Sequence, residues 1–120
     1  MIALVTGGNR GIGLEVCRQL AEKGYKVVLG SRDLSKGHLA AQDVPGEVTV
    51  KQLDVTSEAN VRDVVSYLES EHGLLDVLVN NAATDYSALV VRDYSHHPKT
   101  HVCDIHFTTE FVGDQMIPAI

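Results

Sequence analysis

Four glycines fall within eight residues near the start of the chain, in the stretch TGGNRGIG at residues 6–13. An apolar run, IALV, precedes this stretch, and apolar residues at helical spacing begin at Ile12. Glycine loses more conformational freedom on folding than any other residue, so a cluster this dense implies a backbone path that side chains would block. We therefore expect a strand, then a glycine loop that something approaches closely, then a helix.

Strand-like and helix-like segments alternate along the following residues. The hydrophobic pattern predicts strands at 2–5, 25–30, 48–53 and 74–79, and helices from 12 to about 23, at 33–43 and from Thr56 or Ser57 to Ser70. Gly24 and Gly73 stand where these helices should end, and Gly37 weakens the second helix by about 1 kcal/mol relative to alanine. Such alternation predicts an α/β fold with a Rossmann-type parallel sheet and right-handed crossovers.

The pattern weakens after Ala83. Residues 84–99 show no clear period, whereas Val102, Ile105, Val112 and Met116 fit one face of a helix that Pro118 would end. The predicted order is therefore βαβαβαβα, a truncated doubly wound fold in one domain spanning residues 1–120. Only half of a doubly wound sheet is expected, which leaves the edge of the first or fourth strand without a neighbour.

Composition narrows the classes of function. The chain has 120 residues, of which 44% are hydrophobic and 5% aromatic, so one soluble domain with an aliphatic core is expected. A net charge of −6 argues against nucleic acid and anionic membranes as partners. Cys17 and Cys103 are far apart, which suggests neither a zinc site nor a disulfide, and we find no signal peptide or membrane-spanning run. We expect a cytoplasmic protein.

The glycine loop has the context of a phosphate site. A helix N-terminus offers unpaired N–H groups and a partial positive charge, and glycines before it let a diphosphate touch the backbone. We assign Gly7 to the turn, Gly11 to the close approach and Gly13 to tight packing of the helix on the strand. The spacing Gly-x-x-x-Gly-x-Gly differs from the usual dinucleotide fingerprint, and a purely structural turn is the alternative interpretation.

The ends of the predicted strands add polar groups at the edge where open α/β sheets bind ligands. Arg32 follows the second strand and Arg10 lies in the glycine loop, and two guanidinium groups favour the 2′-phosphate of NADP(H). Asp33 leaves NAD(H) open as the less favoured coenzyme. Asp54 follows the third strand, and two asparagines follow the fourth.

Four stretches together resemble the short-chain dehydrogenase/reductase family, and within it the carbonyl reductase branch. They are TGGNRGIG, SRD at 31–33, LDVT at 53–56 and LDVLVNNAA at 75–83, so the resemblance covers residues 1–83, and 84–120 form a drifted segment. The resemblance implies hydride transfer between NADPH and a carbonyl or alcohol. It also implies a set of coenzyme-binding residues: Gly7, Asn9, Arg10, Gly11, Ile12, Gly13, Ser31, Arg32, Asp54, Val55, Asn80, Asn81 and Ala82. Ala83 replaces a glycine of the family's Asn-Asn-Ala-Gly.

The catalytic groups that the family implies are missing from the chain. A tyrosine acts there as general acid in Tyr-x-x-x-Lys, with a serine and an asparagine nearby. None of the four tyrosines has a lysine four residues later: the residues found there are Leu29, Glu71, Val90 and Pro98. His106 stands at the asparagine's position, and we interpret it as an unselected position. We expect very poor turnover from this chain.

The sequence also raises three other hypotheses. His97 and His101 are four residues apart, but no acidic residue completes a metal motif and Pro98 interrupts, so we predict no metal site. The alternative to an enzyme is a non-catalytic NADP(H)-binding or interaction protein, in which a homodimer or a full-length relative covers the exposed sheet edge. A third hypothesis is an incomplete gene product without a function of its own.

Overall fold

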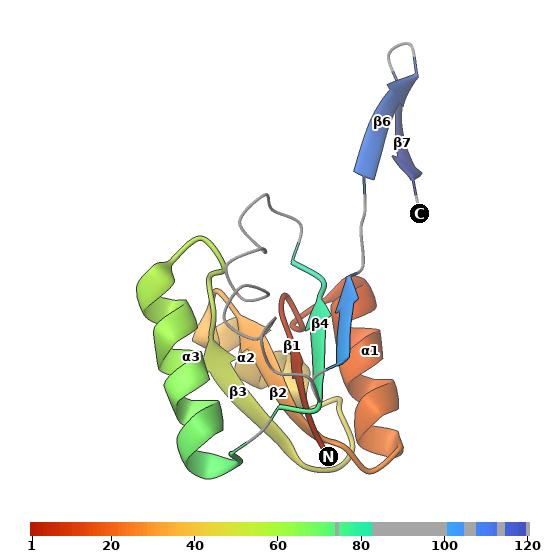
Figure 1. Cartoon of the computed structure of the whole chain (residues 1–120). Helices are drawn as coiled ribbons and strands as arrows, with labels where there is room; N and C mark the ends of the chain where they lie inside the picture. The colour runs from red at the N-terminus through yellow and green to blue at the C-terminus, as the bar shows by residue number, and fades with distance from the viewer. Residues whose placement is uncertain (74, 83–100, 105–107, 113–114, 120) are drawn as a thin grey trace.

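The computed structural model describes residues 1–73, 75–82, 101–104, 108–112 and 115–119 (Figure 1). Three helices are described: α1 (Gly11–Glu22), α2 (Leu34–Ala41) and α3 (Glu58–Glu71). The strands are β1 (Ile2–Val5), β2 (Lys26–Ser31), β3 (Val48–Gln52), β4 (Val77–Asn80), β5 (His101–Asp104), β6 (Thr108–Val112) and β7 (Gln115–Ala119). The predicted helices and strands of the first 80 residues are confirmed, with ends that shift by a few residues.

Five parallel strands form the main sheet in the order β3-β2-β1-β4-β5. The chain runs outward from β1 to β3 and then returns to place β4 on the other side of β1. The strand order therefore reverses between β1 and β4, and open α/β sheets bind ligands beyond the carboxyl ends of the strands at such a point. This topology confirms the predicted Rossmann-type fold.

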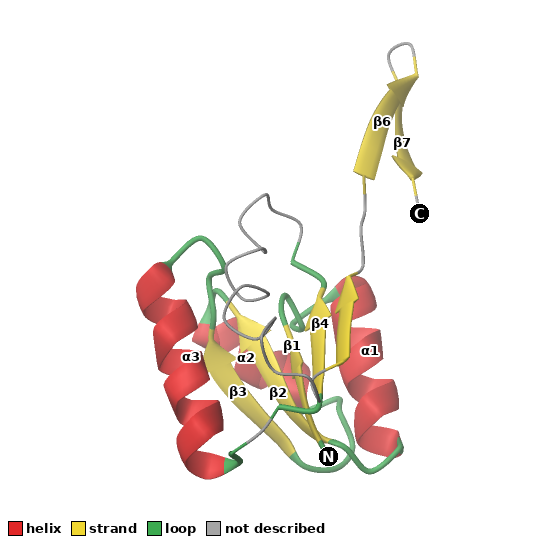
Figure 2. Ribbon diagram, in the orientation of Figure 1, coloured by secondary structure: helices red, strands yellow, loops and turns green. Residues whose placement is uncertain are grey.

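Side chains that alternate along the strands build a core on each face of the sheet. On one face, Leu4 packs with Val61 and Leu68 of α3. On the other, Val5 packs with Cys17 of α1 and Leu29. Because both faces are covered, as the helices in Figure 2 show, the strands can be apolar throughout, and this explains the continuous apolar runs in the sequence.

The helices begin and end where local chemistry favours it. The Ser57 hydroxyl caps α3 by accepting a hydrogen bond from the Asn60 N–H at 3.2 Å. Gly24 and Gly73 end α1 and α3 with φ angles of +91° and +79°, in the left-handed region that favours glycine. Gly37 lies inside α2 because a Cβ there would come within 2.7 Å of a methyl carbon of Val50 on β3. Close packing on the sheet thus explains a residue that weakens the helix.

The carboxyl-terminal prediction is wrong. Instead of one helix through Val102, Val112 and Met116, the chain forms β5, which pairs with β4, and an antiparallel ribbon of β6 and β7. Backbone hydrogen bonds to the open edge of β4 outweigh the local helical spacing. Pro118 lies in β7, where a two-stranded ribbon has an outer edge that tolerates proline. Ile105 and residues 84–99 lie outside the described part of the chain.

The predicted open edge is also wrong for β1 and β4. β1 lies between β2 and β4, and β4 lies between β1 and β5, so both strands have a neighbour on each side. Of the five strands, β3 and β5 are the outer ones. A dimer that covers β1 or β4 therefore has no support.

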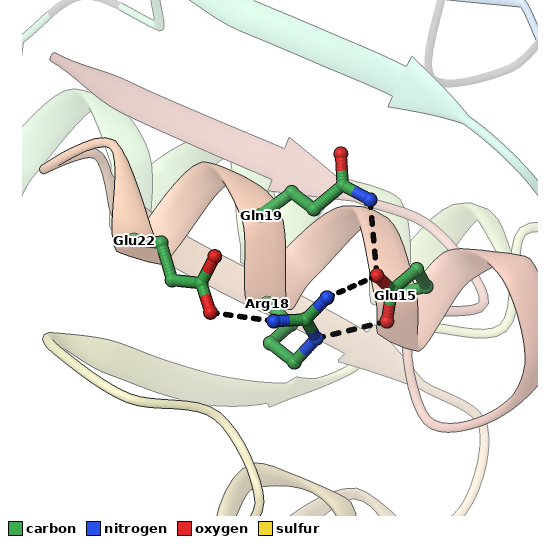
Figure 3. A network of polar contacts seen from close by, with 4 residues as sticks. All are labelled: Glu15, Arg18, Gln19 and Glu22. Atoms are coloured by element: carbon green, nitrogen blue, oxygen red, sulfur yellow. Dashed lines mark hydrogen bonds and ion pairs between the residues drawn. The ribbon is translucent and has the colours of Figure 1, made fainter.

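The solvent face of α1 carries a network of charged side chains (Figure 3). Arg18 donates hydrogen bonds to the carboxylates of Glu15 and Glu22, and Gln19 donates one to Glu15 at 3.0 Å. These residues follow the i,i+3 and i,i+4 spacing of one helix face. These side chains are exposed to solvent, so their ion pairs contribute little to the stability of the protein.

Candidate functional site

A cleft of about 930 Å³ lies beyond the carboxyl ends of β1, β2 and β3. Its walls come from the glycine loop, from the segments that follow β2, β3 and β4, and from α2. The lining residues are Gly7, Asn9, Arg10, Gly11, Leu14, Ser31, Arg32, Asp33, Lys36, Leu39, Ala40, Asp43, Leu53, Asp54, Val55, Thr56, Asn81 and Ala82. The volume suits a small organic ligand.

The glycine loop has the backbone that the sequence suggested. Gly7 and Gly11 adopt φ angles of +62° and +56°, which L side chains rarely adopt. The turn predicted at Gly7 is confirmed. A Cβ at Gly11 would have no atom within 4 Å, so the backbone there faces open space in the cleft wall. A ligand can therefore reach the main chain at Gly11.

The amino end of α1 has no side-chain cap. Arg10 occupies the N-cap position without a capping hydrogen bond, and no acidic residue lies in the first turn. By contrast, Asp33 caps α2 and Ser57 caps α3. A helix leaves its first N–H groups unpaired unless a cap, water or a ligand bonds them. The end of α1 that opens into the cleft is thus available to an anion.

Gly13 holds this end of α1 against the glycine loop and β4. A Cβ at Gly13 would lie 2.3 Å from both the Gly7 carbonyl oxygen and the Asn81 Nδ2. That Asn81 amide donates a hydrogen bond to the same Gly7 oxygen at 2.9 Å. The close packing predicted at Gly13 is present, with the loop and Asn81 as its partners. The side chain of Asn81 therefore holds the glycine loop in place through its hydrogen bond to the Gly7 carbonyl.

Thr6, which the sequence analysis missed, joins β1 to β4. Its hydroxyl is completely buried and accepts hydrogen bonds from the backbone N–H groups of Asn81 and Ala82, each at 3.0 Å. The hydroxyl also donates to the Val79 carbonyl at 3.4 Å. A polar residue at the end of a buried apolar strand was the available signal. Thr6 fixes the segment after β4 next to the glycine loop.

Three cationic side chains line the cleft. Arg10 comes from the glycine loop, Arg32 from the segment after β2 and Lys36 from α2. Ser31 is buried, and its hydroxyl donates to the Asp33 carbonyl at 2.7 Å, which holds the chain between β2 and α2. Lys36 is the second residue that the sequence analysis missed, although it follows Arg32 by about one helical turn. The three cations offer an anion-binding wall.

Asp54 lines the cleft beyond the carboxyl end of β3, the strand that pairs with β2. Its carboxylate accepts hydrogen bonds from the Thr56 hydroxyl at 2.6 Å and from the Thr56 N–H at 2.9 Å. These bonds, with a smaller contribution from the charge of Arg32, lower the pKa of Asp54 below its usual range. Val55 is buried next to it. Asp54 is therefore a charged group of fixed orientation at neutral pH.

Most of the predicted coenzyme residues lie along the cleft, and three do not. Ile12 is 47% exposed on α1, Gly13 is buried behind the loop, and Asn80 is buried in β4. His97 and His106 lie outside the described residues. Within the described residues no cluster of three metal-binding side chains occurs. None of the helices described has the length and apolarity needed to cross a membrane.

Known proteins resemble the chain over most of its length. The family model for short chain dehydrogenase matches residues 1–117. (-)-Isopiperitenone reductase of Mentha piperita is 51% identical over 87 aligned positions, in an alignment that covers 67% of this chain and 28% of the relative. Carbonyl reductase (NADPH) 1 of Homo sapiens is 34% identical over 123 aligned residues, covering 99% of this chain and 44% of the relative.

A solved structure agrees with these relatives. Menthone neomenthol reductase from Mentha piperita has a TM-score of 0.65 and 39% identity, over 78% of this chain and 37% of that one. The chain thus spans less than half the length of each of these three proteins. The family match, the relatives and the fold agree, and the chain belongs to the short chain dehydrogenase family of oxidoreductases.

Proposed function

We propose that the cleft binds NADP(H), and that the chain forms the coenzyme-binding part of a reductase that transfers hydride between NADPH and a carbonyl or alcohol. The observation that carries this proposal is the uncapped amino end of α1, which opens into the cleft behind two glycines of positive φ. We further propose that residues 1–120 act as one domain in the cytoplasm.

In this proposal the diphosphate lies at the amino end of α1. The N–H group of Gly11, which lines the cleft, is the donor nearest the ligand, and the open backbone there lets the ligand come close. Gly7 turns the chain, and Asn9 lines the approach. The helix end contributes a partial positive charge as well as hydrogen bonds. The residues present therefore fit a pyrophosphate.

The adenosine half then lies toward β2 and β3. Arg32 and Arg10 supply charge-assisted hydrogen bonds to a 2′-phosphate, each contributing about 1.5–3 kcal/mol. The hydroxyl of Ser31 already donates a hydrogen bond to the Asp33 carbonyl, so we assign Ser31 to the lining of the cleft and not to a hydrogen bond with the coenzyme. Asp54 and Val55 flank the adenine. Residues 80–82 lie on the nicotinamide side, where Asn80 and Ala82 support the segment after β4.

The names of the relatives favour the same coenzyme and substrate class. One relative, at 34% identity, is a carbonyl reductase whose name specifies NADPH. A solved L-sorbose reductase, at 26% identity and a TM-score of 0.66, is described as complexed with NADPH. We accordingly propose NADP(H) over NAD(H), and a small-molecule carbonyl or alcohol as substrate.

The coenzyme supplies the hydride, and the protein has to orient the substrate and provide the proton. The 120 residues contain no Tyr-x-x-x-Lys pair. General acid catalysis typically contributes about 10²–10⁴-fold to a rate. We therefore expect these residues, taken alone, to bind NADPH and to reduce carbonyls very poorly.

A second candidate is a non-catalytic NADP(H)-binding or interaction protein. Such a protein would bind the same coenzyme in the same cleft, alone, as a homodimer or with a full-length relative. The two candidates share the coenzyme and differ in turnover. A carbonyl panel with NADPH separates them, because oxidation of NADPH that rises with protein concentration supports the enzyme only.

Titration of the protein with NADPH, followed by coenzyme fluorescence, tests the proposal. We expect saturable binding that Arg32→Gln weakens by about tenfold or more, since one charge-assisted contact to the 2′-phosphate is lost. Arg62→Gln is the matched control, because Arg62 is exposed on α3 and pairs only weakly with Glu58 at 3.4 Å. Absence of binding to the unmodified chain would overturn both candidates.

A further inference from the structure

The N-cap of α2 adds a carboxylate, that of Asp33, to the lining of the cleft. Asp33 follows Arg32 and lines the cleft together with it and Lys36. An acidic residue near the end of the second strand is where many dinucleotide-binding proteins hold the ribose hydroxyls.

The hydrogen bonds of Asp33 commit it to the helix. Its Oδ1 accepts from the Lys36 N–H at 3.2 Å, in the geometry of an N-cap. Its carbonyl oxygen accepts from the Ser31 hydroxyl at 2.7 Å and from the Gly37 N–H at 3.0 Å. Contacts on both sides thus fix the residue, and the orientation of the carboxylate is set by α2.

The cap and the charge of Asp33 have separable effects. An N-cap needs only a short side chain with an acceptor, so asparagine and serine cap about as well as aspartate. The cap starts α2 at the place that brings Lys36 into the same cleft as Arg32. The negative charge, however, lines the same cleft as Arg32, to which we assign the 2′-phosphate, and like charges repel.

We propose that Asp33 is a specificity-determining residue that caps α2, does not bind the ribose, and weakens the binding of a 2′-phosphate through its charge. This inference rests on the proposed function, that the cleft binds NADP(H). It assigns the coenzyme preference to the balance between the positive charges of Arg10, Arg32 and Lys36 and the negative charge of Asp33, which is one of the three carboxylates that line the cleft, with Asp43 and Asp54.

The test compares Asp33→Asn and Asp33→Ser with the unmodified full chain. Dissociation constants are measured for 2′,5′-ADP and 5′-AMP, which differ by the 2′-phosphate, and for NADPH and NADH. Both variants keep the cap and lose the charge. We expect 2′,5′-ADP and NADPH to bind about two- to fivefold more tightly, as removal of a nearby surface charge predicts. We expect 5′-AMP and NADH to change by less than about twofold, because their phosphates lie farther away.

Two control variants separate charge from capping. Asp43→Asn removes another cleft carboxylate, two residues beyond the end of α2, and we expect a smaller shift since α2 is about 12 Å long and salt screens charges over about 8–10 Å. Asp33→Ala removes both charge and cap, so it should unfold at a lower temperature than Asp33→Asn.

The possible results distinguish a failure of this inference about Asp33 from a failure of the proposal that the cleft binds NADP(H). Tenfold weaker binding of NADH and 5′-AMP by Asp33→Asn would show a ribose contact and overturn the inference. An unchanged constant for 2′,5′-ADP would overturn it too, while NADPH binding by the unmodified chain would leave the proposed function standing. If the unmodified chain binds no coenzyme, both fail together.

Discussion

Substitution of Gly13 by alanine tests how closely α1 must approach the glycine loop. The added Cβ would lie 2.3 Å from the Gly7 oxygen and from the Asn81 Nδ2, where real contacts are essentially never below 3.0 Å. Either α1 moves outward or the Asn81 amide leaves the Gly7 oxygen. Overpacking costs about 1–3 kcal/mol and a lost hydrogen bond about 0.5–1.5 kcal/mol. The better helix propensity of alanine returns about 1 kcal/mol.

We therefore expect Gly13→Ala to lower the free energy of unfolding by about 1–3 kcal/mol and to abolish NADPH binding. Urea unfolding followed by circular dichroism gives the free energy, and coenzyme fluorescence gives the binding. A variant that is as stable as the original chain, or more stable, would refute the reasoning. That result would mean that helix propensity outweighs the contact with the loop.

Two comparisons locate the effect. Gly24→Ala strains a backbone at φ +91° but meets no atom within 4 Å, so it should lose stability without losing NADPH binding. A double-mutant cycle of Gly13→Ala with Asn81→Ala should show coupling of about 0.5–1.5 kcal/mol, because the added Cβ meets the same Asn81 amide that Asn81→Ala removes. No coupling would place the strain elsewhere.

Three further outcomes follow from the described contacts. Thr6→Val should lower the free energy of unfolding by about 1–3 kcal/mol in urea, because two N–H groups lose their acceptor, and Thr6→Ser should restore most of it. Burial raises the pKa of the Cys17 thiol to about 12, so iodoacetamide should modify Cys17 only in denaturant, and peptide mass mapping that finds native modification would contradict this. Hydrogen bonds from Arg18 and Gln19 lower the pKa of Glu15 to about 2 from 4.5, so any stability it contributes is present above pH 4.5 and lost toward pH 2; a carboxyl NMR titration with a midpoint near 4.5 would contradict this.

The sequence was enough to predict the sheet and helices of the first 80 residues because each one has a local signal. Apolar runs such as the one at Ile2–Val5 mark strands buried on both faces, and Ser57 and Gly73 mark the ends of α3. The glycine loop could be placed for the same reason, since its turns depend on residues next to each other in the chain.

Contacts between segments that are distant in the sequence could not be predicted from local sequence patterns. β5 forms because β4 offers an open edge, and no spacing around Val102 reports the position of that edge. The bonds from Asn81 and Ala82 to Thr6 span 75 and 76 residues, so the role of Thr6 depends on the topology. Lys36 differs from these residues, because the sequence itself shows that it follows Arg32 by four positions. The cap at Asp33, which sets where α2 begins, was the further information needed to place Lys36 in the cleft.

The bonds between Thr6 and the segment after β4 have a consequence for how the chain is made. A ribosome delivers the glycine loop early, yet the groups that brace it, Asn81 and Ala82, emerge only after most of the sheet has been translated. A nascent chain that does not yet include Asn81 and Ala82 has a glycine loop without these hydrogen bonds. Coenzyme capture by the nascent chain would therefore report that the fourth strand has docked.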